Sequence, residues 1–360
     1  MLLSILYFVI ILGIIILVHE FGHYFFSKLF GVYVYEFALG MGPAILSKKS
    51  KAKKDKKNKI FSDLSKSGET TYSIRAIPIG GYCQLAGEDP SDEEDLPKNR
   101  LLNNKPIWQR ALIMFFGAGN NFILAIITLF IIALVWGAPT NKPMIRVVED
   151  SPAGVAGLVN GDIVTRINGD KVKTLDDLQL YLTIVPKGDV KITVNREGKN
   201  KTFTITPLSD EEAEEKGYTV GIGFEQDREY GFISSVKYSF TKTGALIRQL
   251  AITLKELFTG GVGVGELSGP VGIYKVVDET RSTGFANLLY LLAVLCINVG
   301  FINLIPFPAF DGGRILFLLI EKIKGSPVKP ETENLIHNIG FFILLGLIIL
   351  ITIKDIIKLF

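Results

Sequence analysis

Four long apolar stretches punctuate this 360-residue chain, and each is long enough to cross a lipid bilayer. Their periodicity favours helices at about residues 2–30, 107–136, 286–306 and 335–353. The first stretch has no basic residue near its start and continues as a helical pattern, so we expect a membrane span there and not a cleaved leader. Hydrophobic residues make up 48% of the chain, which indicates that lipid is the solvent for much of it.

Between these stretches the pattern changes to short runs typical of strands. Residues 69–85 alternate well enough to predict a strand pair with a bend at Gly80-Gly81. Four β-type runs, IRVV, DIVTRI, VKITV and TFTITP, lie between Met144 and Leu208 and are separated by turn signals such as Asn168-Gly169. The sequence therefore predicts a small α+β module inserted between the second and third spans.

The connection from this module to the third span has two parts. From Phe232 to Phe258, apolar residues recur at helical spacing among basic ones, which suits an amphipathic helix at the membrane surface better than a fifth span. The glycine-rich stretch 260–272 cannot form a regular helix, and it lacks the lysine that a phosphate-binding loop requires.

Charge is distributed unevenly although its sum is small. The formal net charge is +3, so nucleic acid is not an expected partner. A lysine-rich tract at 48–59 follows the first span and reads as a solvated loop, which the positive-inside rule assigns to the cytoplasm. The loop at about 138–285 is then expected outside. The two cysteines, Cys83 and Cys296, are far apart in sequence and predict neither a disulfide framework nor a cysteine zinc site.

The sequence HEFGH at 19–23 is the first candidate for chemistry. On a helix, His19 and His23 project from one face and can bind a single zinc ion, and Glu20 is then placed to act on water at that ion. Ionisable side chains are costly inside an apolar span unless they are paired or coordinated. A functional reading of these three residues is therefore favoured over a helix that merely emerges at the interface.

Catalytic zinc normally has three protein ligands, so a third is needed. His337, the one remaining histidine, opens the fourth span and reads as a snorkelling interfacial residue. Asp311 is the better candidate, because Pro306 and Pro308 interrupt the helix before it, and irregular backbone at membrane depth is tolerated when it lines a wet cavity. The alternative is a proline kink with Asp311 as a helix cap.

Four motifs, in the same order, resemble the site-2 protease family of intramembrane metalloproteases, specifically the bacterial sigma-E-factor regulatory type with a single PDZ domain. They are HEFGH, PIGGYCQL, GELSGPVGI and NLIPFPAFDGG. The stretch 151–172 is similar to a bacterial PDZ domain, which would either bind peptides or act as a steric gate. The chain departs from the family where Phe310 replaces a leucine and where no proline follows Gly117.

This resemblance implies a role for each motif residue. Zinc would be bound by His19, His23 and Asp311, with Glu20 as the catalytic base. Residues expected to contact substrate or line the site are Asn303, Pro306, Pro308, Gly80 and Gly81.

The predicted fold is a polytopic α-helical membrane protein of about four transmembrane helices, with a membrane-associated β-hairpin and an inserted α+β PDZ domain. We expect an N-terminal membrane part at 1–137, the PDZ domain at 142–226, and an amphipathic segment with the C-terminal membrane part at 227–360.

The expected activity is zinc-dependent cleavage of transmembrane segments in single-span proteins, such as anti-sigma factors or remnant signal peptides, after an upstream site-1-type protease has trimmed them. The expected location is the bacterial inner membrane. A catalytically inactive PDZ scaffold or chaperone is the alternative. A zinc or proton transporter would require further ionisable residues along several spans, which the second and fourth spans nearly lack.

Overall fold

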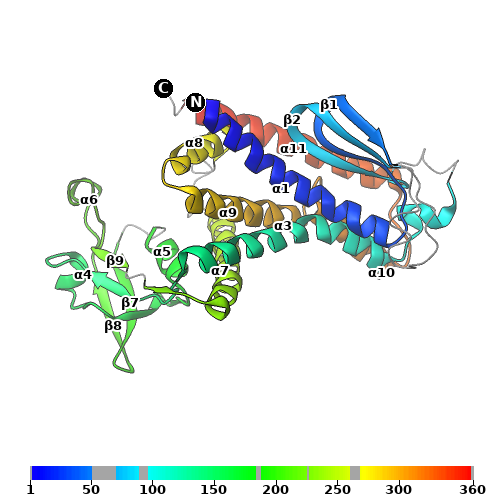
Figure 1. Cartoon of the computed structure of the whole chain (residues 1–360). Coiled ribbons are helices and arrows are strands. Elements are labelled where there is room, and N and C mark those ends of the chain that lie inside the picture. The colour runs from blue at the N-terminus through cyan, green and yellow to red at the C-terminus, as the bar shows by residue number, and fades with distance from the viewer. Residues whose placement is uncertain are drawn as a thin grey trace. The chain divides into compact units, whose positions relative to one another are not determined.

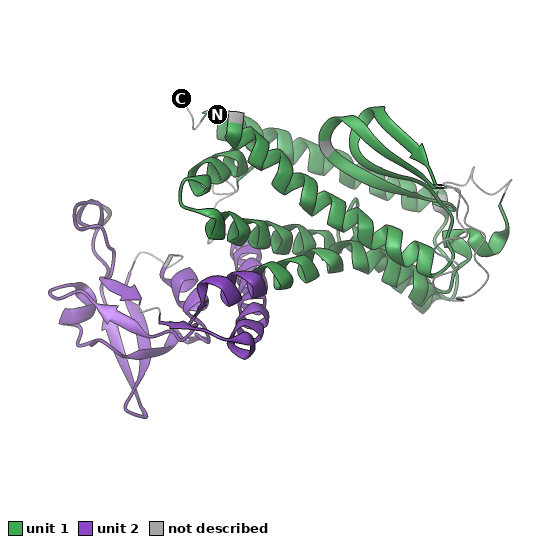
Figure 2. Cartoon of the chain, viewed as in Figure 1, with its two compact units in different colours: residues 1–128, 267–360 green, residues 129–266 purple. Residues whose placement is uncertain are grey.

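The computed structural model describes residues 2–50, 70–88, 96–183, 188–224, 227–259 and 268–357. The chain forms two compact units, residues 1–128 with 267–360, and residues 129–266 (Figure 2). Most of the lysine-rich tract, the acidic residues 89–95 and the glycine-rich residues 260–267 lie outside the described residues.

Four helices in the described part of the chain are long and apolar enough to cross a membrane, which confirms the predicted number of spans. They are α1 (Leu2–Leu29), α3 (Ile107–Trp136), α9 (Phe285–Leu304) and α11 (Pro330–Ile357) (Figure 1). A 20-residue helix is about 30 Å long, the thickness of the hydrocarbon core, so even α9 suffices.

Glycines allow the spans of the first unit to approach closely. A Cβ atom on Gly22 of α1 would lie 1.9 Å from the backbone oxygen of Phe116 on α3, so only glycine fits there. Gly300 of α9 also approaches α3, at Ala118, whose carbonyl oxygen would be 3.1 Å from an added Cβ. Small residues at such contacts are typical of helix packing in lipid, where dispersion between closely spaced backbones holds helices together.

A two-stranded sheet packs beside α1 and consists of β1 (Val34–Lys49) and β2 (Thr71–Leu85). The strand pair predicted within 69–85 was wrong, because residues 71–85 form one strand, β2, which bends at Gly80 with a φ of +87° and pairs along both halves with β1. Its partner β1 was not predicted. The reading of Lys48 and Lys49 as loop residues was wrong, because both pair with β2 at the end of β1.

Glu36 on β1 holds the sheet together. Its carboxylate accepts hydrogen bonds from Ser73, from Arg75 at 2.8 Å and from the Tyr82 hydroxyl at 2.6 Å. Ser73 and Arg75 belong to the first half of β2 and Tyr82 to the second half. One carboxylate thus fastens both halves of the bent strand to β1.

The helix break before Asp311 is present as predicted. Helix α9 ends at Leu304, and α10 (Asp311–Lys324) begins with Asp311 itself. Helix α8 (Pro270–Arg281) precedes α9, and its first turn donates the N–H groups of Gly269 and Gly272 to the Asp355 carboxylate of α11, at 2.7 and 3.0 Å. Asp355 therefore caps α8 and attaches the C-terminal end of α11 to it.

The second unit contains the predicted β module. Its main sheet has the order β6-β5-β7-β8, with β5 (Ile163–Ile167), β6 (Asp170–Lys171), β7 (Val190–Arg196) and β8 (Lys199–Ile205). Smaller pairs join β4 (Ile145–Val147) to β9 (Ile222–Phe224) and β3 (Ala138–Pro139) to β10 (Arg228–Glu229). The described residues of the module also form the short helices α4 (Pro152–Val155), α5 (Leu175–Thr183) and α6 (Asp210–Lys216).

The turn signals of this module act as expected. Asn168 and Gly169 have φ values of +49° and +94°, and Glu197 and Gly198 have +52° and +80°. Two consecutive positive values are typical of the type I′ turns that join tight hairpins. The inward faces of the strands bury a common apolar core that includes Ile145, Val164, Ile192, Val194 and Ile205.

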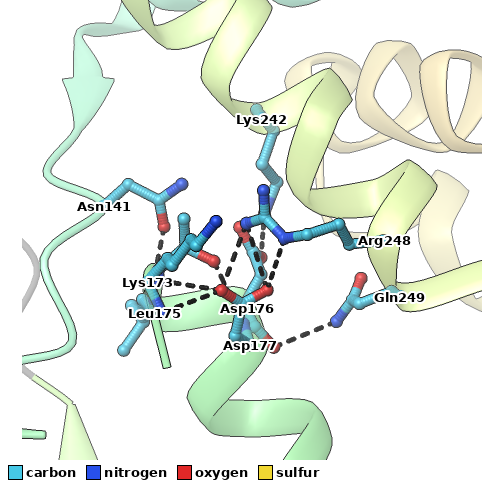
Figure 3. A network of polar contacts seen from close by, with 9 residues as sticks. Asn141, Lys173, Leu175, Asp176, Asp177, Lys242, Arg248 and Gln249 are labelled. Carbon is cyan, nitrogen blue, oxygen red and sulfur yellow. Dashed lines mark hydrogen bonds and ion pairs between the residues drawn. The ribbon is translucent and has the colours of Figure 1, made fainter. Parts of the chain in front are cut away.

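Helix α7 (Phe232–Thr259) covers the range expected for the amphipathic segment and joins the module through a polar network (Figure 3). Lys242 forms an ion pair with Asp176, and Arg248 donates to both carboxylate oxygens of Asp177, at 3.1 and 3.2 Å. Asp177 also accepts the N–H of Thr174 at 3.0 Å, so it caps the start of α5 and anchors α7 at once. The two ion pairs, Lys242 with Asp176 and Arg248 with Asp177, fix α5 against α7.

A third ion pair of the second unit, between Asp162 and Arg196, predicts how the stability of the module depends on pH. Burial alone would raise the pKa of Asp162, but hydrogen bonds from Arg196 at 2.7 Å and from the Val159 N–H lower the pKa below its usual value. This stabilisation is fully present above the pKa of an unfolded Asp, about 3.9, and is lost as pH falls through the lower folded-state value.

We expect Asp162→Asn to destabilise the module by about 2 kcal/mol at neutral pH and to remove this acid-dependent loss. Amide hydrogen exchange in β7 and β8 of the intact chain, followed as a function of pH, measures both the destabilisation and its pH dependence. At pH 7 we expect about 30-fold faster exchange in Asp162→Asn than in the wild type. Asp170→Asn, at an exposed position, is the control. Equal protection in all three proteins would contradict the assigned role of Asp162.

Candidate active site

Three candidate metal ligands converge in the first unit. His19 and His23 come from successive turns of α1, and their Nε2 atoms are 3.3 Å apart. The Oδ2 atom of Asp311, at the start of α10, lies 3.4 Å from each of these nitrogens. In the part of the chain that the structure describes, these residues form the one cluster able to hold a metal ion.

The triangle formed by these atoms has the dimensions of a zinc site. Ligands about 2.05 Å from zinc at the corners of a tetrahedron are about 3.3 Å from one another. Within the described residues, Asp311 Oδ2 is buried and has no hydrogen-bond partner, so the carboxylate is available for a cation. Two imidazoles and a carboxylate are also a known catalytic zinc ligand set, which leaves the fourth position open.

His23 is oriented by a second contact. Its Nδ1 lies 2.9 Å from the carbonyl oxygen of Ile113 on α3, so that nitrogen carries the proton and donates. The lone pair is then on Nε2, the atom that faces His19 and Asp311. A hydrogen bond from the opposite ring nitrogen to a carbonyl is the usual way in which proteins orient a metal-binding histidine.

Glu20 lies between the cluster and the sheet. The backbone N–H of Cys83 on β2 donates a hydrogen bond to its carboxylate. A Cβ on Gly81 would lie 3.5 Å from Glu20 Cγ and 2.9 Å from Ile16, so glycine at 81 lets β2 approach α1 at this point. Glu20 is therefore held by the sheet, one residue from His19. Gly80 instead lies against Met41 and forms the bend.

The remaining predicted residues lie at the break after α9. Asn303 donates from Nδ2 to the carbonyl oxygen of Val299, 3.0 Å away on its own helix. Pro306 is exposed, and Pro308 is partly buried against Gly340 of α11. These residues shape the turn that leads to Asp311.

Gly117 is a site residue that sequence reasoning did not identify. A Cβ at this position of α3 would lie 2.2 Å from His23 Nε2 and 3.0 Å from Asp311 Oδ2, that is, inside the ligand cluster. The sequence signal that could have identified it is the stretch Gly117 to Phe122 in the second span. That stretch was used only to note that the proline expected from the family pattern is missing.

The reading of His337 as a snorkelling interfacial residue was wrong. Its Nδ1 accepts a hydrogen bond from the backbone N–H of Ala309 at 3.1 Å, and its ring packs against Phe317 with centroids 5.4 Å apart. The side chain turns toward the break before Asp311 because a freed backbone N–H at that break needs an acceptor.

Helices long and apolar enough to span a membrane, together with a largely buried cluster of two histidines and a carboxylate, define the class of membrane metalloenzymes. The model of peptidase family M50 matches residues 7–347. The chain is 31% identical to the regulator of sigma-W protease RasP of Bacillus subtilis (strain 168), over 99% of both proteins. It is 30% identical to the zinc metalloprotease RasP of Shouchella clausii, over 99% of both, and to that of Geobacillus kaustophilus, over 99% of this chain and 98% of the relative.

The chain therefore belongs to peptidase family M50, the site-2 protease family. It is a zinc metalloprotease and a bacterial membrane protein, and its metal is Zn²⁺.

The contact at Gly117 generates a direct test of the cluster. We expect Gly117→Ala to weaken zinc binding by at least about 10-fold, because the added methyl group occupies the space between His23 and Asp311. Zinc retained by the purified protein after dialysis against a chelator measures the effect. Gly13→Ala on α1, where an added Cβ meets nothing within 4 Å, is the matched control and should bind zinc normally. Unchanged zinc retention in Gly117→Ala would contradict the assignment.

Proposed function

We propose that this protein is an intramembrane endopeptidase that cleaves transmembrane segments of single-span membrane proteins. The observation that carries the proposal is the depth of the ligand cluster. At roughly 1.5 Å per residue, His19 is about 26 Å from Leu2 and about 15 Å from Leu29 along α1. In a spanning helix this position falls within the hydrocarbon layer, where a substrate bond must also be to react.

His19, His23 and Asp311 are proposed to hold the zinc. When bound there, zinc polarises a carbonyl group and lowers the pKa of water toward about 7. Glu20 accepts a proton from water and later returns it to the amine that leaves, so one carboxylate serves as base and then as acid. The hydrogen bond from the Cys83 N–H keeps this carboxylate in position beside the cluster.

A transmembrane substrate must unwind before cleavage, because a helix hides its carbonyl groups in i to i−4 hydrogen bonds. The sheet of β1 and β2 can supply replacement partners by accepting an extended segment at its edge. Gly81 supports this role, since it brings β2 next to Glu20. Asn303, Pro306 and Pro308 are proposed to contact the unwound segment at the break before Asp311.

The second unit is proposed to be a PDZ domain on the outer side of the bacterial inner membrane, with the lysine-rich loop in the cytoplasm. It would exclude intact ectodomains or bind trimmed tails, so cleavage would follow an upstream site-1-type protease. Support comes from the hairpins and apolar core of the module. One relative is named a regulator of sigma-W protease, which supports a proposed role in sigma-factor regulation; anti-sigma factors and remnant signal peptides are the proposed substrate classes. The lipid bilayer is the expected environment, and nucleic acid is not an expected partner.

The test is cleavage of a single-span substrate with a shortened ectodomain by the purified protein in detergent. We expect Glu20→Gln to lower the rate by about 10² to 10⁴-fold while zinc remains bound, because only the proton acceptor is lost. A zinc chelator should abolish cleavage by the wild type. Glu279→Gln, on an exposed residue of α8, is the control and should cleave normally.

A different result would favour the alternative function. If wild type and Glu20→Gln, both containing zinc, leave the substrate equally intact, catalysis is excluded for this substrate class and an inactive scaffold or chaperone takes its place. If both cleave it equally, the role of Glu20 is wrong.

A further inference from the structure

The turn that carries Asp311 into the cluster is tightly wound and strained. Ala309 has a φ of +78°, a left-handed conformation that is unfavourable for a residue with a Cβ. A Cβ on Gly312 would lie 2.3 Å from the carbonyl oxygen of Ile305, and one on Gly313 would lie 2.4 Å from that of Phe307. Such a conformation persists only where the surrounding structure holds it in place.

Helix α11 supplies that support from two positions one turn apart. His337 accepts the Ala309 N–H at Nδ1, 3.1 Å away. Gly340 lies on the same face, and a Cβ there would be 2.4 Å from Pro308 Cβ and 2.8 Å from the Pro308 carbonyl oxygen. The backbone of α11 at Gly340 is therefore in direct contact with Pro308, and the His337 imidazole accepts a hydrogen bond from the next residue, Ala309.

The His337 ring is itself held. Phe317 of α10 packs against it, so the ring that supports the turn also contacts the helix that Asp311 begins. Glu333, one turn earlier on α11, has its nearest carboxylate oxygen 3.9 Å from Nε2, too far for a hydrogen bond, so the contact that holds the ring is the one with Phe317. With Nδ1 as the acceptor, the neutral ring carries its proton on Nε2, which faces this carboxylate.

We infer that His337 and Gly340 form a brace, here called the α11 brace, that holds Pro308 and Ala309 and thereby positions Asp311 toward His19 and His23. Both are positioning residues, since the metal-ligand cluster of the described residues has no member on α11. The inference rests on the proposed role of Asp311 as a zinc ligand. Zinc sites require ligand distances within about 0.2 Å of their ideal values. A shift of Ala309 that moves Asp311, two residues later, therefore weakens zinc binding.

The brace is separable from the general attachment of α11. At its other end, Asp355 holds α11 to α8 through the N–H groups of Gly269 and Gly272. Loss of the contacts at 337 or 340 therefore leaves α11 attached. This separation allows a positioning role to be distinguished from a purely structural one.

The test compares paired variants of the full-length protein in detergent. His337→Leu removes the acceptor, whereas His337→Asn keeps an oxygen near the position of Nδ1. Gly340→Ala inserts a methyl group against Pro308, whereas Gly346→Ala makes the same change on α11 where nothing lies within 4 Å. Zinc affinity is measured by competition with a chromophoric chelator, and ligand geometry by the visible absorption of the Co²⁺-substituted protein.

We expect His337→Leu and Gly340→Ala to bind zinc about 10 to 100-fold more weakly than wild type and to change the Co²⁺ spectrum. His337→Asn and Gly346→Ala should match wild type in both measurements. If all four variants bind zinc like wild type, the brace is overturned. The same holds if His337→Asn is as weak as His337→Leu. If Gly340→Ala does not fold, the pair at 337 decides alone.

These outcomes are independent of the proposed peptidase activity, because zinc affinity is measured without substrate. A wild type that binds zinc tightly but cleaves nothing refutes the proposed function and leaves the brace standing. An Asp311→Asn variant that binds zinc like wild type refutes the ligand role, and the brace falls with it.

Discussion

Two imidazoles and a carboxylate have to meet among helices whose other surfaces are apolar, and much of the first unit follows from this requirement. Polar groups at this depth are costly unless they are coordinated or hydrogen-bonded. Helix α1 brings two of them together by their spacing of four residues. The third needs a break in the chain, which lets α10 begin with Asp311 beside α1. The irregular backbone after α9 is thus a condition of the site.

Close packing around the cluster imposes a second condition, the absence of side chains. Gly22 lets α3 approach α1, and Gly117 leaves the space in which the ligand atoms face one another. Gly81 does the same for β2 beside Glu20. Gly22 of α1 faces α3, whereas Gly117 of α3 and Gly81 of β2 both face α1, so the cluster is enclosed by a helix on one side and a sheet on another. Even a methyl group at any of these glycine positions would push the neighbouring elements apart.

The second unit is organised by the burial of apolar side chains and by local turn geometry. Its strands bury one face around a shared apolar core, and its hairpins turn at residues with positive φ. The buried carboxylate of Asp177 accepts hydrogen bonds from Arg248 of α7 and from N–H groups at the start of α5, and the carboxylate of Asp176 pairs with Lys242 of α7 (Figure 3). Here local signals and tertiary contacts agree, which explains why the strands were predicted from short runs of sequence.

The sequence by itself determined whatever depends on neighbours along the chain. Length and apolarity identified the four spans, and alternation with turn residues identified the module. The spacing of four residues identified the pair His19 and His23. Ligand count and family resemblance pointed to Asp311. Only the tertiary structure showed that β1 pairs with β2, that Gly117 faces the cluster, and that His337 reaches Ala309. Periodicity reports which face of an element is apolar, but it carries no information on which distant residue that face will meet, because packing among several elements decides such contacts.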